Sequence, residues 1–321
     1  IATGARFTRV MLGGSGTVLL LFLINAIFRG AGDAAIAMRV LWLANAINIT
    51  LGPCLIFGLG PFPRLGVVGA AIGTTIGRGT GVLYQLYRLT RGDGRVAVRR
   101  VHLGLDPTVM RGILRVSGTA TFQNFIATAS WIGIMRILTG FGSAALAGNT
   151  IGIRIIMFAL LPSFGVSNAA ATLVGQNLGA GRPDRAEQAA WQAGLYNTFC
   201  LAAVGAVFLL FAPALIAIFT SDPNVAPYGI RCLRIIAGGF LFYGYGMVLT
   251  QAFNGAGDTR TPTLIHLLCL WLWELPLAWT LAHPGGFGPT GVFIGVSVAF
   301  STLALVSGVL FKQGHWKTRW V

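Results

Sequence analysis

The sequence predicts an all-α polytopic membrane protein, and its composition, its long apolar stretches and an internal repeat all indicate that class. Hydrophobic residues make up 55% of the 321 residues, and charged residues make up only 10%. The mean hydropathy is +0.75, whereas about 25% of the residues in a soluble domain are charged. A chain of this composition is expected to lie in a lipid bilayer.

Nine stretches are long enough to be membrane helices, since about 20 apolar residues cross a bilayer. The expected spans are 11–28, 34–58, 66–88, 116–139, 144–175, 187–217, 226–253, 261–282 and 289–311. We expect residues 1–90 to form three helices and 116–321 to form six. A basic cytoplasmic linker, 91–115, joins the two parts. The four cysteines, at 54, 200, 232 and 269, lack the spacing of metal ligands and are expected to be reduced.

Two parts of the chain look like copies of one three-helix unit. Asn25–Asp33 reads NAIFRGAGD, and Thr250–Asp258 reads TQAFNGAGD. Further along, GVVG at 66–69 returns as GPTG at 288–291, and each opens another apolar stretch. Duplicated helix bundles are typical of transporters, because two similar halves can move against one another around a central site.

The positive charge alternates between the two sides of this nine-span arrangement. Of the 23 Lys and Arg residues, 15 fall on one side, which the positive-inside rule makes cytoplasmic. A nucleic-acid patch would not alternate in this way, so no nucleic-acid partner is expected. The arrangement places Val321 inside and residue 1 outside. Residues 116–217 have no repeat partner, so we expect three further spans before residue 1 and interpret the chain as N-terminally truncated.

The motifs of the chain resemble the multidrug and toxic-compound extrusion (MATE) family over nearly all 321 residues. Val174–Gly181 reads VGQNLGAG, and the GAGD turns at 30–33 and 255–258 also match. Asn48–Gly58 and Gly66–Thr74 are similar to the family in the same order. The resemblance implies a two-lobe bundle of helices in which this chain supplies spans four to twelve of twelve. The glycines of Val174–Gly181 are interpreted as close-packing positions rather than substrate contacts.

One acid lies well inside an expected span. Seven of the eight acidic residues are at loops or helix ends, and we interpret Asp33 and Asp258 as helix caps. Glu274 is the exception, and a carboxylate within a membrane is costly and commonly functional. We take it as a candidate proton-coupling group, with His266 as a candidate relay. For Glu274, the alternatives are an ion pair with the arginine at 136 or 154 and a carboxylate that reaches the outer interface. For His266, the alternative is a packed, hydrogen-bonded core histidine.

The resemblance implies further site residues. A cation site in the first half would be supported by Asn25, Asn48 and Thr74, while its acid would precede residue 1. The sodium-coupled branch of the family also has carboxylates in the helices that correspond to 116–139 and 226–253, and here these hold none. Coupling to H⁺ through the part that would precede residue 1 is therefore favoured over a Na⁺ site. The candidate substrate-cleft residues are Gln123, Asn124, Tyr243, Tyr245 and Gln251; alternatively, these make hydrogen bonds between helices.

The predicted function is export of organic, often cationic compounds by exchange with H⁺ or Na⁺ through alternating access. The protein is expected to be a monomer in the cell inner membrane with a cytoplasmic C-terminus. Its partners would be small organic substrates and the bilayer, with no cofactor, metal or enzymatic reaction. Two alternatives stay open: a flippase for lipid-linked saccharides, which Arg78, Arg136 and Arg154 would serve, and a pseudotransporter that moves nothing.

Overall fold

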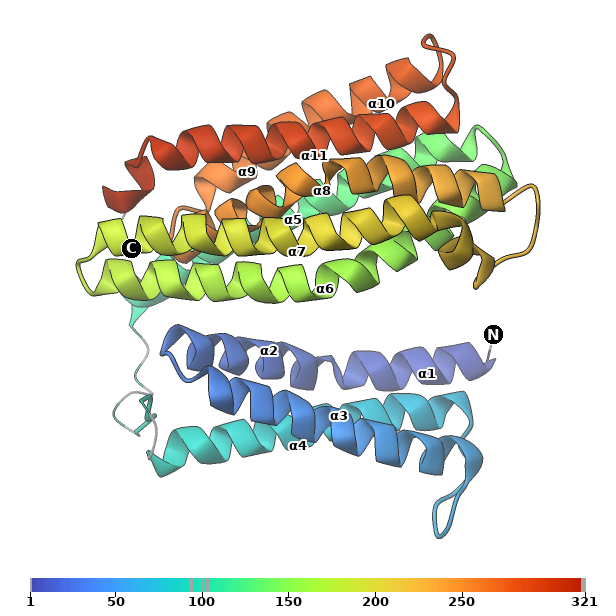
Figure 1. Ribbon diagram of the computed structural model, residues 1–321. Coiled ribbons are helices and arrows are strands. Elements are labelled where there is room, and N and C mark those ends of the chain that lie inside the picture. Colours follow the sequence, from blue (N-terminus) through green and yellow to red (C-terminus); the bar gives the residue numbers. More distant parts are fainter. Residues whose placement is uncertain (1, 93–94, 100, 102–103, 105, 319–321) are drawn as a thin grey trace. The chain divides into compact units, whose positions relative to one another are not determined.

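The computed structural model is helical and divides into two units, Ile1–Leu105 and Asp106–Val321. It describes all residues except 1, 93–94, 100, 102–103, 105 and 319–321. Unit 1 contains α1 (Ala2–Gly13), α2 (Ser15–Gly30), α3 (Ala34–Phe57) and α4 (Val67–Arg91) (Figure 1). The expected first span is bent by 41° between α1 and α2. At this bend, a Cβ on Gly14 would lie 2.7 Å from the Thr75 side chain of α4.

Unit 2 is a bundle of long helices that lie alongside one another (Figure 1). Its elements are α5 (Pro107–Thr139), α6 (Ser143–Gly179), α7 (Pro183–Ala217), α8 (Ala226–Gly255), α9 (Arg260–His266), the π-helix η2 (Leu267–Glu274), α10 (Leu275–Ala282), α11 (Pro289–Lys312) and the short 3₁₀ helix η3 (His315–Thr318). The elements α9, η2 and α10 together form one apolar path, Arg260–Ala282.

Six helices of the described chain are long and apolar enough to cross a membrane, or seven if the bent α1–α2 pair is one span. This count is lower than the nine spans expected from the sequence. The helices α4 and α5 have the length but fall outside the count. Both are more polar than the other spans, since α4 carries three arginines and α5 contains Gln123, Asn124 and several Ser and Thr residues. The multi-pass, all-α class is confirmed.

The predicted repeat is present in the backbone. In both GAGD turns the second glycine has positive φ, 83° at Gly32 and 78° at Gly257. The aspartate N–H that follows donates to a phenylalanine carbonyl five residues earlier, at 2.8 and 3.0 Å. The glycines that open α4 and α11 also match, with φ/ψ of 57°/−135° at Gly66 and 55°/−139° at Gly288. Residues with a Cβ rarely adopt these angles, so the sequence repeat records a repeated backbone geometry.

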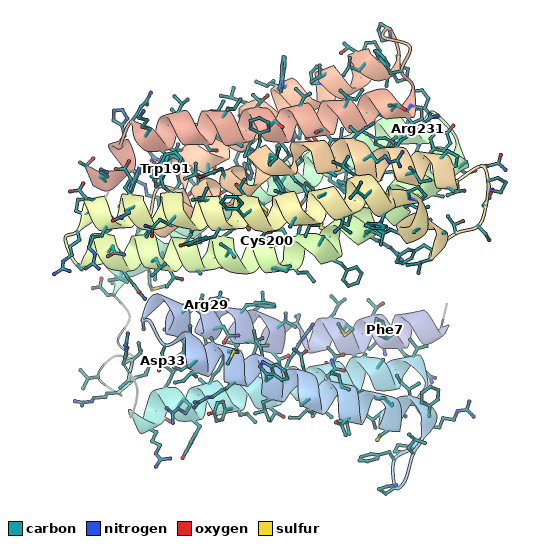
Figure 2. The ribbon with its side chains drawn as sticks, in the orientation of Figure 1. Phe7, Arg29, Asp33, Trp191, Cys200 and Arg231 are labelled. Atoms are coloured by element: carbon teal, nitrogen blue, oxygen red, sulfur yellow. The ribbon has the colours of Figure 1, made fainter. Side chains whose placement is uncertain are left out.

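The aspartates at helix starts act as caps, as predicted. Asp33, labelled in Figure 2, accepts a hydrogen bond from the N–H of Ile36 at 3.4 Å. Asp258 accepts from the N–H and the hydroxyl of Thr261 at 3.3 and 2.6 Å. These bonds satisfy backbone donors that a helix start leaves unpaired. Neither aspartate is placed to act as a coupling group inside a span.

The helices α6 and α8 touch through glycines. A Cβ on Gly255 would clash with the carbonyl oxygen of Ala171, and one on Gly175 would lie 2.9 Å from the carbonyl oxygen of Gly255. Small residues allow membrane helices to approach this closely. Gly175 belongs to the VGQNLGAG motif, so its role at this position is helix packing, as the sequence predicts.

The short helix η3 is tied to the start of α7. The Trp316 ring is fully buried and stacks on Phe311 with centroids 4.5 Å apart. The Lys317 ammonium lies 2.5 Å from a Glu187 carboxylate oxygen and 3.4 Å from one of Asp184. The hydrogen bond to Glu187 raises the pKa of Lys317. An apolar anchor and an ion pair therefore hold η3 against the bundle.

Candidate functional site

Unit 2 contains a cavity of about 340 Å³ among α5, α6, α8, α11 and the α9–η2 path. Most of its wall is apolar and aromatic, including Trp131, Phe164, Phe240 and Phe300. A smaller group of polar side chains also faces it: Gln123, Asn124, Ser130, Ser167, Tyr243, Thr250, Gln251, His266, Glu274 and Ser297. A mostly apolar cavity with a few polar groups is the usual form of a small-molecule site.

Among the described residues that line this cavity, Glu274 is the only acid. Its side chain is 4% exposed, and the hydroxyl of Ser130 on α5 donates to its Oε2 atom at 2.7 Å. Among the described residues, no basic side chain forms an ion pair with it. Arg136 and Arg154, which the sequence offered as partners, are exposed. In the part of the chain that the structure describes, Glu274 is therefore a buried carboxylate without an ion pair to either arginine.

The π-helical turn of η2 has a cause in the sequence. Pro276 follows shortly after η2, and a proline ring clashes with the carbonyl four residues earlier in an α-helix. A wider turn before the proline avoids this clash, and π-turns of this kind are common at functional sites. The indole N–H of Trp271 donates to the Ile126 carbonyl at 3.1 Å, which fastens η2 to α5. Glu274, the last residue of η2, is thereby held against α5.

His266 ends α9 and lines the same cavity as Glu274. Its Nδ1 atom is buried and has no hydrogen-bond partner within the described part of the chain. Buried polar atoms are normally paired, and this nitrogen is an exception. The role of His266 as a proton relay stays a prediction.

Four of the five candidate substrate residues line the cavity, and one does not. Gln123, Asn124, Tyr243 and Gln251 belong to its wall. Tyr245 instead packs on α7, with its ring 5.9 Å from that of Trp191. Residues two apart on a helix do not share a face, so Tyr243 and Tyr245 lie on different faces of α8. A substrate contact for Tyr245 stays a prediction.

The sequence analysis missed Ser130. It lies seven residues after Gln123 on α5, which returns to the same helix face after two turns. That spacing could have identified it, but a serine in an apolar helix has no distinctive signal. Its importance comes from contact with η2, which lies 140 residues away in sequence.

Unit 1 has two polar pairs that involve the predicted cation-site residues. The Asn48 amide donates to the Thr74 hydroxyl at 3.2 Å. Asn25 does not join them and instead accepts from the Gln85 amide at 2.8 Å. Asn25 and Gln85 are almost fully buried, at 1% and 0% exposed. The three predicted residues therefore lie in two separate contacts between helices.

Replacing Asn25 with alanine is expected to destabilise the protein by about 1 kcal/mol, because the buried Gln85 amide loses an acceptor. Asn168→Ala is the matched control, since that exposed amide bonds only to Phe164 of its own helix. Thermal unfolding in detergent should show a lower midpoint for the first variant alone. Equal midpoints would mean that the buried pair of Asn25 and Gln85 adds nothing to the stability of the protein.

Comparison with known proteins identifies the family. A family model described as MatE matches residues 120–280, which is half of the chain. The probable multidrug resistance protein NorM of Thermotoga maritima is 30% identical, over 99% of this chain and 68% of that protein. The chain belongs to the MATE family. Pseudomonas aeruginosa has a probable multidrug resistance protein NorM that is 29% identical, over 92% of this MATE chain and 62% of that protein.

Solved MATE structures have the same fold. A MATE in complex with MaL6 superposes with a TM-score of 0.88 at 25% identity, covering 96% of this chain and 69% of that one. An outward-facing multidrug resistance MATE transporter of the MOP superfamily gives a TM-score of 0.87 at 25% identity, with 96% and 68% covered. This protein is thus a MATE family transporter in a membrane, and it spans about two thirds of the length of these relatives.

Proposed function

We propose that this MATE protein exports organic, often cationic compounds in exchange for H⁺, with Glu274 as the proton-coupling group. The observation that carries the proposal is a single buried carboxylate in an aromatic cavity with no basic partner among the described residues. The relatives named as probable multidrug resistance proteins support the substrate class. One relative, from Shewanella oneidensis, is named an FAD transporter, so substrates differ among relatives of this chain.

Exchange follows from competition for one carboxylate. The ionised Glu274 attracts an organic cation, and the aromatic wall adds cation–π and apolar contacts. A proton that binds Glu274 removes this negative charge and weakens the binding of the organic cation. By linkage, the cation weakens proton binding by the same factor. A proton gradient can then drive the compound out through alternating access.

The polar pairs of unit 1 are proposed as supports of a second cation site. The oxygens of Asn25, Asn48 and Thr74 are the hard ligands that such ions prefer. Asp33 is the only acid that the structure describes in unit 1, and it caps α3. The charge for this site would therefore come from another part of the protein. Na⁺ as the coupling ion is the alternative that the experiment below decides.

The competing functions have less support. A flippase for lipid-linked saccharides would need basic residues around its substrate, and no Arg or Lys is among the described residues that line the cavity of unit 2. A pseudotransporter was suggested by the absence of acids in the cleft and of the first three helices. The buried Glu274 in the cavity wall argues against the first of these two reasons. We further propose a monomer in the inner membrane, with the C-terminus on the cytoplasmic side, because the basic connections lie there.

Transport in proteoliposomes tests the proposal, using the protein together with any sequence that precedes Ile1 in its gene. A fluorescent organic cation is loaded, and pH and Na⁺ gradients are imposed separately. We expect the pH gradient alone to drive accumulation of the fluorescent cation against its own concentration gradient. Accumulation under the Na⁺ gradient alone, or under neither gradient, would overturn coupling to H⁺.

A further inference from the structure

Ser130 makes two contacts with the π-helical segment that cannot both be full hydrogen bonds. Its Oγ atom lies 2.7 Å from the Glu274 carboxylate and 2.9 Å from the Leu270 carbonyl oxygen. A serine hydroxyl carries one hydrogen and two lone pairs. It can therefore donate fully to one of these acceptors at a time. Ser130 is 2% exposed, so water does not offer an equivalent partner.

We propose that Ser130 is a positioning residue that transmits the protonation state of Glu274 to the backbone of η2. This inference rests on the proposed role of Glu274 as the coupling group. It concerns a step that follows proton binding: the change in the contact between α5 and η2.

The ionised state fixes the hydroxyl in one direction. A carboxylate accepts hydrogen bonds and donates none, so the Ser130 hydrogen points to Glu274 Oε2. The Leu270 carbonyl then lacks the serine as a donor. In this state Ser130 holds the carboxylate, but the tie from α5 to the main chain of η2 is broken.

The protonated state reverses the direction. A proton taken from water binds a carboxyl oxygen of Glu274, and the new O–H donates to a lone pair of Ser130 Oγ. The serine hydrogen is then free to turn to the Leu270 carbonyl. Two hydrogen bonds run in series, from Glu274 to Ser130 and from Ser130 to Leu270. Nothing but the one proton is gained, and it returns to water when Glu274 ionises.

The hydrogen bond from Ser130 to the Leu270 carbonyl matters because η2 has few other hydrogen bonds to α5. The second main-chain bond between them is the one from the Trp271 indole to Ile126. Protonation of Glu274 thus raises the number of such ties from one to two, and proton release lowers it. π-helical turns are rare inside α-helices and occur frequently at functional sites. Proton binding at Glu274 therefore stiffens the contact between α5 and η2, and proton release loosens it.

Other titratable groups do not interrupt this chain of bonds. The titratable side chains that line the cavity with Glu274 are His266 from α9 and Tyr243 from α8. Neither makes a hydrogen bond with Ser130 or Glu274 in the described structure. The helices α5, α6 and α11 contribute no charged side chain to the wall.

Infrared difference spectra between low and high pH test the inference on the reconstituted protein. The C=O band of protonated Glu274 is assigned as the band that Glu274→Gln removes. In Ser130→Ala, this band should move to higher frequency, because the carboxyl O–H loses its acceptor. The pH midpoint of transport should also move up by about one unit, since the ionised form loses the stronger, charge-assisted bond. Ser130→Thr keeps a hydroxyl and should restore both values.

Ser301→Ala is the matched control. Ser301 lies on α11 outside the cavity lining, and its hydroxyl bonds to the Ser297 carbonyl of its own helix. It should leave the band and the midpoint unchanged. Suppose that the band is unshifted in Ser130→Ala while Glu274→Gln still removes both the band and proton-driven transport. This result would overturn the proposed role of Ser130 alone. Proton-driven transport that survives Glu274→Gln would instead overturn the proposed function.

Discussion

Replacing Glu274 with glutamine is expected to abolish efflux driven by a pH gradient. Glutamine keeps the size of the side chain and can still bond to Ser130, but it cannot bind and release a proton. Coupling between two ligands is commonly worth a factor of about 5 to 150 in affinity, and this factor is lost. Uptake in proteoliposomes with a pH gradient should therefore fall to the level seen without a gradient.

The pH dependence of the same variant gives a second readout. In the native protein, raising the pH ionises Glu274 and strengthens binding of an organic cation, whereas lowering the pH weakens it. In Glu274→Gln this dependence should be flat. Glu187→Gln is the matched control, because that carboxylate pairs with Lys317 outside the cavity. A native pH profile in Glu274→Gln would show that another group couples transport to the proton.

Replacing Gly255 with alanine is expected to destabilise the protein by about 1–3 kcal/mol, as overpacking does. The new Cβ would clash with the Ala171 carbonyl oxygen and lie 2.7 Å from its carbonyl carbon. Both are backbone atoms of α6, so no side chain can turn aside and the helices must move apart. The midpoint of thermal unfolding in detergent measures the effect.

Gly238→Ala is the matched control on the same helix. A Cβ at Gly238 meets no atom within 4 Å. Alanine also favours a helix over glycine by about 1 kcal/mol. The control should therefore keep or raise the unfolding midpoint. A midpoint for Gly255→Ala equal to that of Gly238→Ala would contradict tight contact between α6 and α8.

The sequence predicted the local features of this protein well. The caps at Asp33 and Asp258 were identified from a short polar residue at a helix start. The glycine turns of the repeat were found from spacing alone and occur at nearly identical angles. Glu274 stood out because it is an acid among apolar residues. Each of these signals depends on residues a few positions apart in the chain.

Features that depend on helix rotation were not predicted. Tyr243 and Tyr245 looked equivalent in the sequence, yet Tyr243 stacks on Phe300 beside the cavity and Tyr245 packs against α7. The π-turn of η2 changes the phase of its helix, so a regular 3.6-residue pattern could not place Glu274 opposite Ser130. The count of spans also depended on how apolar α4 and α5 are over their full length.

The sequence by itself determined the membrane class, the repeated turns, the family and the one acid in an apolar span, because composition and short-range spacing specify these. Only the tertiary structure decided that Glu274 faces a cavity without an arginine partner and that Ser130 touches both it and the backbone of η2. The partners lie 144 residues apart. Such contacts are made by packing between distant helices, which no local pattern in the chain records.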